Sequence, residues 1–223
     1  METFNELPNL LSLAKQVEKL IREAILAGRM KPHVLYTETK LAQQLGVSRS
    51  PVREAVLELA SRGFLTVFPR RGFKVRMFSQ KAIRDLYGLR WALESHAVRT
   101  LAESPSKYDL SLLTQSALAQ KESALKQELA GVVKYGLDFH SALMYLLDND
   151  MMTRSLEDIR DTLNIVWAQA FASTVSPIKV AGDHLDLAAK IEKGDSDGAC
   201  ALLKIHLKCS EDAVIEAQDS PEA

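Results

Sequence analysis

The chain has 223 residues, of which 47% are hydrophobic and 26% charged, and its formal net charge is −1. This composition excludes an intrinsically disordered chain, and no apolar run approaches the ~18 residues that a membrane-spanning helix needs. The start, METFNELPNL, has no basic segment ahead of an apolar core, so we expect no secretory signal. The two cysteines, Cys200 and Cys209, are too far apart in one predicted helix to pair, which favours a reduced, cytoplasmic protein.

The near-zero net charge combines two parts of opposite sign. Residues 1–78 contain 13 lysines and arginines against seven acidic residues, whereas residues 79–223 contain 15 against 22. A basic module of this kind typically meets a polyanion, and an acidic module beside it has a different task. The total charge is therefore no argument against binding to nucleic acid.

The N-terminal part predicts three helices. Residues 10–27 carry apolar side chains at helical spacing. Two shorter helices follow, each after an N-cap candidate, Thr37 or Ser48, and a Leu-Gly-Val-Ser turn separates them. Pro51 suits the first turn of the second short helix, which we expect to end at Gly63. Two short helices around such a turn are typical of a helix-turn-helix.

A small hairpin is predicted next. Residues 64–68 and 73–75 are β-prone, and the Pro-Arg-Arg-Gly sequence at 69–72 forms the turn between them. A hairpin after a helix-turn-helix forms a wing, here with two arginines at its tip. We therefore expect a winged helix-turn-helix domain over residues 1–76 and a linker over residues 77–80.

From residue 79 onward the pattern is helical and predicts an all-α bundle over residues 81–217, followed by a disordered tail at 218–223. The predicted fold class is mainly α. The longest helical segments are expected at 82–103 and 153–174. The predicted breaks, which delimit about six helices, lie at Ser104–Ser106, near Gly131, at Asp148–Asp150, at Ser176–Pro177 and at Lys193–Asp195.

The start of the second short helix carries side chains suited to reading DNA. Arg49 and Arg53 are spaced i, i+4 and share a face, and either can form two hydrogen bonds to guanine. Two arginines at this spacing, taken alone, more often only make an exposed helix face soluble. The neighbouring helices, the wing and the positive charge of this part of the chain favour DNA binding. Further phosphate or minor-groove contacts are expected from Lys40, Ser48, Ser50, Arg70 and Arg71.

The stretch from Ala42 to Ala55, AQQLGVSRSPVREA, together with Gly63 and the Arg71-Gly72 pair, resembles the winged helix of the GntR family of bacterial transcription regulators. The match covers nearly all of residues 10–76. The resemblance implies double-stranded DNA as partner, in the form of a pseudo-palindromic operator bound by a homodimer. The DNA contacts it implies fall on Thr39, Ser48, Arg49, Ser50, Pro51, Arg53, Arg71 and Gly72.

The helical part resembles, more loosely, the ligand-binding (FCD) domain of the FadR-like subfamily. The resemblance rests on residues 86–94, on residues 138–149 and on the segments around His184 and His206. It implies a small-molecule effector, typically an organic acid. Many relatives hold a divalent metal with an Asp and a His at i, i+4 and two more histidines. The matching histidines are His140, His184 and His206, whereas the Asp position is Gly136.

Three interpretations of the histidines follow. They can hold Zn²⁺ or Ni²⁺ with water or an effector carboxylate at the open position. They can instead hydrogen-bond an effector directly, without a metal. They can also be satisfied core residues.

Arg90 lies on an otherwise apolar helix face, where a guanidinium can clamp an effector carboxylate through two hydrogen bonds. The alternative is a surface pair between Arg90 and Glu94, one helical turn away. The other effector-binding candidates are Tyr87, Tyr135 and Asn164, and the alternative for each is a side chain that only packs in the bundle.

The predicted function is a cytoplasmic transcription regulator, by family habit a repressor, whose operator affinity an effector controls. No nucleophile motif, phosphate loop or useful carboxylate pair is found, so we expect no enzyme. The alternatives are a metal-responsive protein and a purely architectural DNA-binding protein, neither with an organic effector.

Overall fold

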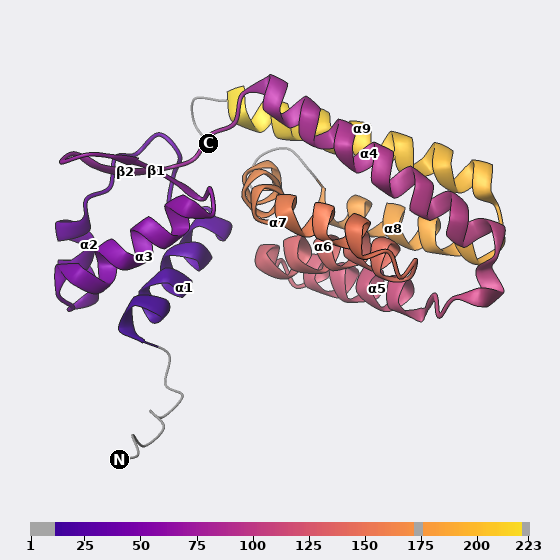
Figure 1. The fold of residues 1–223 in the computed structure, drawn as a ribbon, viewed down its shortest axis with the longest axis horizontal. Helices are drawn as coiled ribbons and strands as arrows, with labels where there is room; N and C mark the ends of the chain where they lie inside the picture. The colour runs from indigo at the N-terminus through magenta and orange to yellow at the C-terminus, as the bar shows by residue number, and fades with distance from the viewer. Residues whose placement is uncertain (1–11, 172–175, 220–223) are drawn as a thin grey trace, which may run out of the picture.

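The computed structural model describes residues 12–171 and 176–219. In these residues a small N-terminal domain with three helices and two strands precedes a larger helical domain (Figure 1). The predicted fold class is thereby confirmed. The elements are α1 (Leu13–Leu26), α2 (Glu38–Leu45), α3 (Arg49–Ser61), β1 (Leu65–Phe68), β2 (Gly72–Val75), α4 (Gln80–Glu103), a 3₁₀ turn (Pro105–Lys107), α5 (Ser111–Leu125), α6 (Leu129–Tyr145), α7 (Asp150–Phe171), α8 (Pro177–Glu192) and α9 (Ser196–Asp219).

The helix-turn-helix begins and ends at the predicted capping residues. The side chain of Thr37 accepts a hydrogen bond from the Lys40 amide, 3.3 Å long, at the start of α2. Gly46 ends α2 in the left-handed conformation, which glycine adopts without steric cost. Ser48 precedes α3 with an extended backbone, although its side chain makes no capping hydrogen bond. The buried face of α3 consists of Val52, Ala55, Val56 and Leu59.

The wing is an antiparallel hairpin, as predicted. Strands β1 and β2 pair in a register that places Leu65 opposite Val75. A third segment, which the sequence analysis did not anticipate, extends the sheet: Tyr36 and Phe73 exchange two backbone hydrogen bonds of 2.9 Å. The segment before α2 is thereby tied to the wing.

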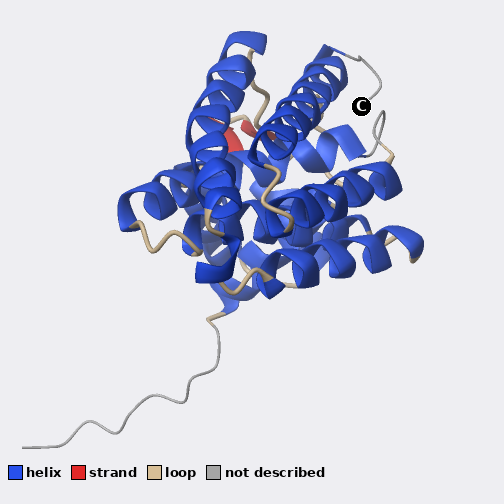
Figure 2. Cartoon of the chain, turned by 90° about the vertical axis from the view of Figure 1, so that its right-hand side faces the viewer, coloured by secondary structure: helices blue, strands red, loops and turns tan. Residues whose placement is uncertain are grey.

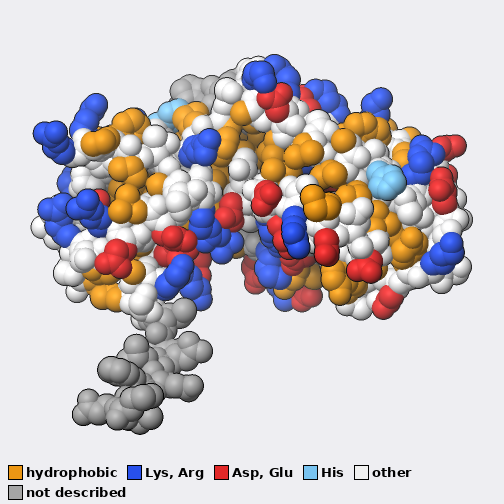
Figure 3. All heavy atoms as spheres, viewed as in Figure 1, with side chains coloured by type: hydrophobic (Ala, Val, Ile, Leu, Met, Phe, Trp, Pro, Cys, Tyr) orange, Lys and Arg blue, Asp and Glu red, His pale blue; other side chains and the backbone are white. Residues whose placement is uncertain are grey.

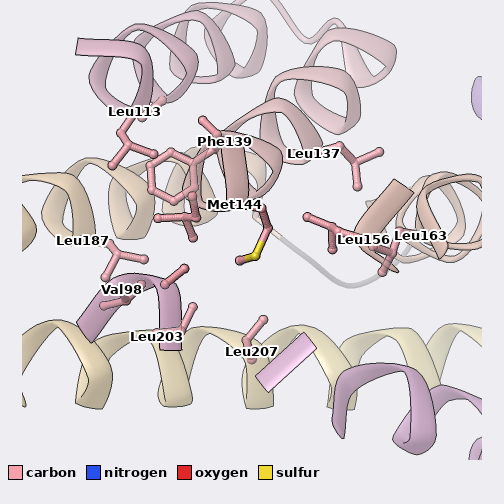
Figure 4. Packing of buried hydrophobic residues seen from close by; sticks show 14 of the residues in the cluster. Val98, Leu113, Leu137, Phe139, Met144, Leu156, Leu163, Leu187, Leu203 and Leu207 are labelled. Carbon is pink, nitrogen blue, oxygen red and sulfur yellow. The ribbon is translucent and has the colours of Figure 1, made fainter. Parts of the chain in front are cut away.

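The C-terminal domain is a bundle in which α4 and α9 lie side by side along one face (Figure 1). A view turned by 90° shows helices throughout its described part (Figure 2). Apolar side chains from all six α-helices of the domain, α4 to α9, form its core, and burial of each large one stabilises the fold by about 1.5–3 kcal/mol. Figure 4 labels Val98, Leu113, Leu137, Phe139, Met144, Leu156, Leu163, Leu187, Leu203 and Leu207.

Helix α7 joins the two domains. Its residue Ile165 is fully buried and belongs to the apolar cluster of the N-terminal domain, together with Val17 of α1 and Phe64 beside the wing. The same helix contributes Leu163 and Trp167 to the core of the C-terminal domain. One helix therefore belongs to both cores.

Some predicted boundaries were wrong. The break expected near Gly131 lies earlier, between the end of α5 and Leu129, and Gly131 is inside α6. Helix α9 continues through 218–219, where a disordered tail was expected, and it is as long as α4, with 24 residues. Two predictions lie outside the described residues: the start of the first helix at 10–11, and the end of a long helix at 172–174. Cys200 and Cys209 are unpaired, as expected.

Candidate functional site

The start of α3 and the wing form one exposed basic surface. Lys and Arg side chains gather at the end of the N-terminal domain that points away from the bundle, at the left of Figure 3. A hollow of about 610 Å³ separates α3 from the wing. Its lining includes six of the predicted DNA-contacting residues, Thr39, Arg49, Arg53, Arg70, Arg71 and Gly72. The hollow therefore brings together side chains that are up to 33 positions apart in the sequence.

The other predicted contacts flank this hollow. Lys40, Ser48 and Ser50 are exposed, and Pro51 is half-buried in the first turn of α3. The hydroxyl of Ser50 donates to Glu54 over 3.2 Å.

Among the described residues, the partner of Arg49 is a single carboxylate at a long distance. Its guanidinium lies 3.4 Å from the Glu38 carboxylate, and 67% of its side chain is exposed. An exposed pair of this kind contributes little to stability, so Arg49 can exchange Glu38 for DNA at small cost.

Gly72 sets the shape of the wing. Its φ is +132°, and a Cβ at this position would overlap the carbonyl oxygen of Tyr36. Only glycine combines this backbone with such a close approach. Because Tyr36 pairs with Phe73, the arginines at the wing tip are held against the segment that leads into α2.

Three buried histidines from different helices converge in the bundle: His140 of α6, His184 of α8 and His206 of α9. The Nε2 atom of His184 lies 3.1 Å from the Nε2 of His140 and 3.1 Å from the Nε2 of His206. In the described residues this is the group of histidine, cysteine and acidic side chains whose ligand atoms are close enough to share a metal ion.

The opposite ring nitrogens of these histidines face acceptors. The Nδ1 of His140 lies 2.8 Å from Glu94 Oε2, and the Nδ1 of His184 lies 2.6 Å from Gln120 Oε1. The Nδ1 of His206 lies 3.6 Å from the Asp183 carboxylate, an electrostatic contact rather than a hydrogen bond. Burial holds the pKa of His140 and of His184 well below the ordinary value of 6.5, so both rings are neutral at physiological pH.

These contacts decide where the ring protons lie. A neutral imidazole that donates from Nδ1 has a lone pair at Nε2. The Nε2 atoms of His140 and His184 then face each other as two acceptors with no proton between them. A cation bound by both lone pairs would stabilise this arrangement. Metal-binding histidines typically donate their other N–H to a carboxylate, carbonyl or similar acceptor, as these do. The residues present therefore fit a divalent metal.

Arg90 is fully buried beside this cluster. Its Nε donates to Glu94 Oε1 over 2.8 Å, and Glu94 also contacts His140, so one carboxylate links both. The two terminal nitrogens of Arg90 have no hydrogen-bond partner among the described residues. The predicted alternative, an ion pair between Arg90 and Glu94 at the surface, was wrong about the location. The two residues do form an ion pair, but both side chains are buried. A small anion would satisfy both free donors.

Two aromatic rings enclose the Arg90 guanidinium. Its carbon lies 5.1 Å from the ring centre of Tyr87 and 4.8 Å from that of Trp167. Trp167 Nε1 donates to the Tyr87 hydroxyl over 2.8 Å, and this hydroxyl shares a further hydrogen bond with Ser210. Tyr87 was predicted here, and its contacts place it at the site.

Two predicted effector residues have other surroundings. Tyr135 lines a separate surface depression between α5 and α6, with Lys134 over its ring. Asn164 donates to the Arg160 carbonyl of its own helix. These contacts are local, and the role of both residues in effector binding stays a prediction.

The acceptors behind the histidines were not predicted from the sequence. No role was predicted for Gln120 or Asp183, and Glu94 was predicted only as a surface partner of Arg90. For Gln120 a signal existed, since it falls on the buried face of α5 at helical spacing from Leu113 and Ala117.

The comparisons with known proteins agree with both halves of this picture. Residues 13–75 match the model described as "Bacterial regulatory proteins, gntR family", and residues 85–208 match the FCD domain model. The chain belongs to the GntR family and carries an FCD domain. Its family and relatives are transcription regulators rather than enzymes, and the family's regulators bind DNA.

Two curated relatives span most of the chain. The HTH-type transcriptional repressor RspR of Escherichia coli K12 is 26% identical over 202 residues, which cover 87% of this chain and 85% of the relative. The Nta operon transcriptional regulator of Aminobacter aminovorans is 28% identical over 187 residues, which cover 83% and 87%.

A putative GntR regulator of Rhodococcus sp. RHA1, whose crystal structure is known, has the same fold. Its TM-score is 0.75 at 23% identity, with 92% of this chain and 99% of that one covered. In this GntR-family chain, none of the helices in the described residues is long and apolar enough to cross a membrane.

Proposed function

We propose that this GntR-family chain is a homodimeric repressor whose operator affinity is controlled by an organic acid bound in its FCD domain. The observation that carries the proposal is Glu94, which links His140, one of three converging histidines, to a buried arginine whose two terminal nitrogens have no partner among the described residues. The Arg90 and Glu94 charges compensate each other and the rings are neutral, so a divalent ion held by the histidines would give this site an excess positive charge that attracts an anion. Because bacterial operators lie in the cytoplasm, the regulator acts there.

DNA binding uses the basic face of the N-terminal domain, which we take as residues 1–76. Arg49 and Arg53 at the start of α3 read guanines in the major groove. The exposed hydroxyls of Ser48 and Ser50, and Lys40, Arg70 and Arg71, contact phosphates or the minor groove. In a two-fold symmetric dimer, two such faces match a pseudo-palindromic operator.

In the FCD domain, which we take as residues 81–217, His140, His184 and His206 hold a divalent ion such as Zn²⁺ or Ni²⁺ through Nε2. When bound, the ion supplies a Lewis acid for an effector carboxylate. Arg90 orients the anion by two hydrogen bonds from its terminal nitrogens. Tyr87 and Trp167 hold the guanidinium in place and exclude water from it.

Helix α7 offers a route from this site to DNA. Trp167 covers Arg90, whereas Ile165, two residues earlier, packs in the N-terminal core. An effector that changes the packing of Trp167 therefore shifts the helix that also contacts the DNA-binding domain. Such control requires that the effector binds two arrangements of the domains with different affinity. The linker at residues 77–80 absorbs the movement.

The experiment is a thermal unfolding titration of the full chain with Zn²⁺, with sodium acetate, and with both, followed by operator gel shifts under the same conditions. Ligands that bind the folded state raise the midpoint by mass action. We expect stabilisation by the metal, and a change in operator affinity with a carboxylate. A midpoint and operator affinity insensitive to every metal and carboxylate would instead support an architectural protein. Stabilisation by metal alone would support a metal-responsive one.

A further inference from the structure

Gln120 is a buried amide with no unused polar atom. It lies on α5 and is fully shielded from solvent. Its Nε2 donates to the carbonyl oxygen of Val132 over 3.1 Å, and its Oε1 faces the Nδ1 of His184 at 2.6 Å. A polar side chain in this position connects the backbone of α6 with a histidine of α8.

The Val132 carbonyl determines which way the amide points. A carbonyl oxygen only accepts hydrogen bonds, so the NH₂ group of Gln120 must face it. The amide oxygen then faces His184, and it accepts a hydrogen bond from this ring only if Nδ1 carries the proton. The ring of His184 is therefore held as the tautomer whose Nε2 carries a lone pair, and that lone pair points at the other two histidines.

Gly136 leaves the space that this amide occupies. It lies one helical turn before His140 on α6, and a Cβ added there would lie 2.5 Å from Gln120 Nε2 and 3.2 Å from a ring carbon of Trp167. A real Cβ essentially never lies within 3.0 Å of another heavy atom, so a side chain at this position requires the Gln120 amide, the end of a flexible side chain, to shift. A side chain at 136 is therefore incompatible with the amide in its present position.

We propose that Gln120 is the positioning residue of His184 and that Gly136 is its necessary complement. Together they make a site with three neutral nitrogen ligands and no protein carboxylate, so that the charge of a bound dication is left for an anionic effector to compensate. This inference rests on the proposed metal-binding function and adds to it the residues that define the ligand set.

The first test compares Gln120→Ala with Gln115→Ala, an exposed glutamine on the same helix. Co²⁺ is titrated into the metal-free full chain and followed by its visible absorption, and Zn²⁺ affinity is measured by competition with a chromophoric chelator. We expect Gln120→Ala to lose about 10- to 100-fold in affinity and to change the Co²⁺ spectrum, as loss of such outer contacts typically does. Gln115→Ala should match the wild type. Equal affinity and equal spectra for all three proteins would overturn the proposal.

The second test uses the glycine. Gly136→Ala should weaken metal binding by about tenfold or more, because its Cβ displaces the amide that orients His184. Gly182→Ala, on the same helix as His184 but with no atom within 4 Å of an added Cβ, is the matched control. In Gln120→Ala/Gly136→Ala the two losses should not add, since both act through one contact. Additive losses would contradict a shared mechanism.

A third measurement needs neither a variant nor a metal. The ¹⁵N chemical shifts of the imidazole rings in the metal-free chain report which nitrogen is protonated. We expect His184 to be protonated at Nδ1, and protonation at Nε2 would overturn the proposal. If the wild type binds neither Co²⁺ nor Zn²⁺ but His184 is protonated at Nδ1, the metal function fails while the positioning role of Gln120 stands.

Discussion

Arg62 and Asp161 form an ion pair with two hydrogen bonds across the domain boundary. Arg62 Nε and Nη2 donate to the two Asp161 oxygens over 2.9 and 3.1 Å. Arg62 follows the last residue of α3, and Asp161 lies on α7, one turn before Ile165. The remaining Arg62 nitrogen, Nη1, bonds Glu18 of α1 over 2.8 Å. The end of α3 is thus fastened to α7, the helix that reaches the histidine site.

Asp161→Asn should loosen this connection. The change removes the charge and one acceptor of a pair that is about a third exposed, so the loss of stability should be only about 1 kcal/mol. Its main effect should be on control: the change in operator affinity caused by an effective metal and carboxylate should shrink. Fluorescence anisotropy with labelled operator measures this, with Asp158→Asn, an exposed residue of the same helix, as control. An unaltered response would mean that control does not pass through this pair.

Arg49→Ala should weaken operator binding by about 1–3 kcal/mol and relax the preference for the base that it contacts. The measurement is a gel-shift titration with the operator and with single-base variants of it. Arg84→Ala removes an exposed arginine from the FCD domain and should leave binding unchanged. If Arg49→Ala binds the operator as tightly as the wild type, Arg49 does not contact the bases.

His206→Ala should abolish stoichiometric metal binding, because two imidazoles alone make a poor site. Elemental analysis after dialysis against Zn²⁺ gives the metal content, and the midpoint of thermal unfolding with and without a chelator gives the stabilisation. His96→Ala, which removes an exposed histidine of α4, should keep the metal content and the metal-dependent stabilisation of the wild type. Wild-type protein that stays metal-free after incubation with Zn²⁺ or Ni²⁺ would rule out the metal site.

Arg90→Met should remove the response to carboxylates and also destabilise the fold. The variant leaves the Glu94 carboxylate buried without its cation, and breaking such a pair costs about 3–5 kcal/mol. In Arg90→Met/Glu94→Gln the unpaired charge is gone, so much of the stability should return while the carboxylate response stays absent. Urea unfolding gives the stability and acetate titration gives the response. A double variant that still responds to acetate would exclude Arg90 as the anion-binding group.

Glu18 should make the N-terminal domain sensitive to acid. Burial raises the pKa of this carboxyl, but hydrogen bonds and charges of Lys15 and Arg62 outweigh burial and hold the pKa below the ordinary 4.5. A carboxyl whose pKa is lower in the folded state than in the unfolded state stabilises the fold at pH values above the unfolded-state pKa. This contribution is lost as the pH falls through the folded-state pKa. The difference in urea midpoint between wild type and Glu18→Gln should therefore be present at pH 6 and shrink below pH 4. A difference independent of pH would contradict this.

The sequence predicted the features that depend on local rules. Thr37, Gly46 and Gly72 set caps and turns whose geometry follows from side-chain chemistry a few residues away. Gly131 was misinterpreted as a helix break. Glycine destabilises a helix only modestly, and here a Cβ would overlap the Ser123 hydroxyl oxygen of α5, so close packing of α6 on α5 favours glycine inside the helix.

The surroundings of the histidines could not be predicted in the same way. Their convergence was implied by the resemblance, but Glu94 and Gln120 come from other helices, and Asp183, although next to His184 in the chain, faces His206 of α9. Only packing of the bundle brings these acceptors behind the rings. The orphaned donors of Arg90 are likewise a property of burial and not of spacing.

The burial of Ile165 limits how freely the two domains can be separated. A fragment ending in the linker would lack this side chain, and the apolar cluster around Val17 and Phe64 would open to water. A winged helix transplanted onto another sensor would meet the same difficulty unless the new partner offered a residue of matching shape. The DNA-binding half is in this sense an incomplete fold, because a side chain of the other domain's helix α7 completes its core.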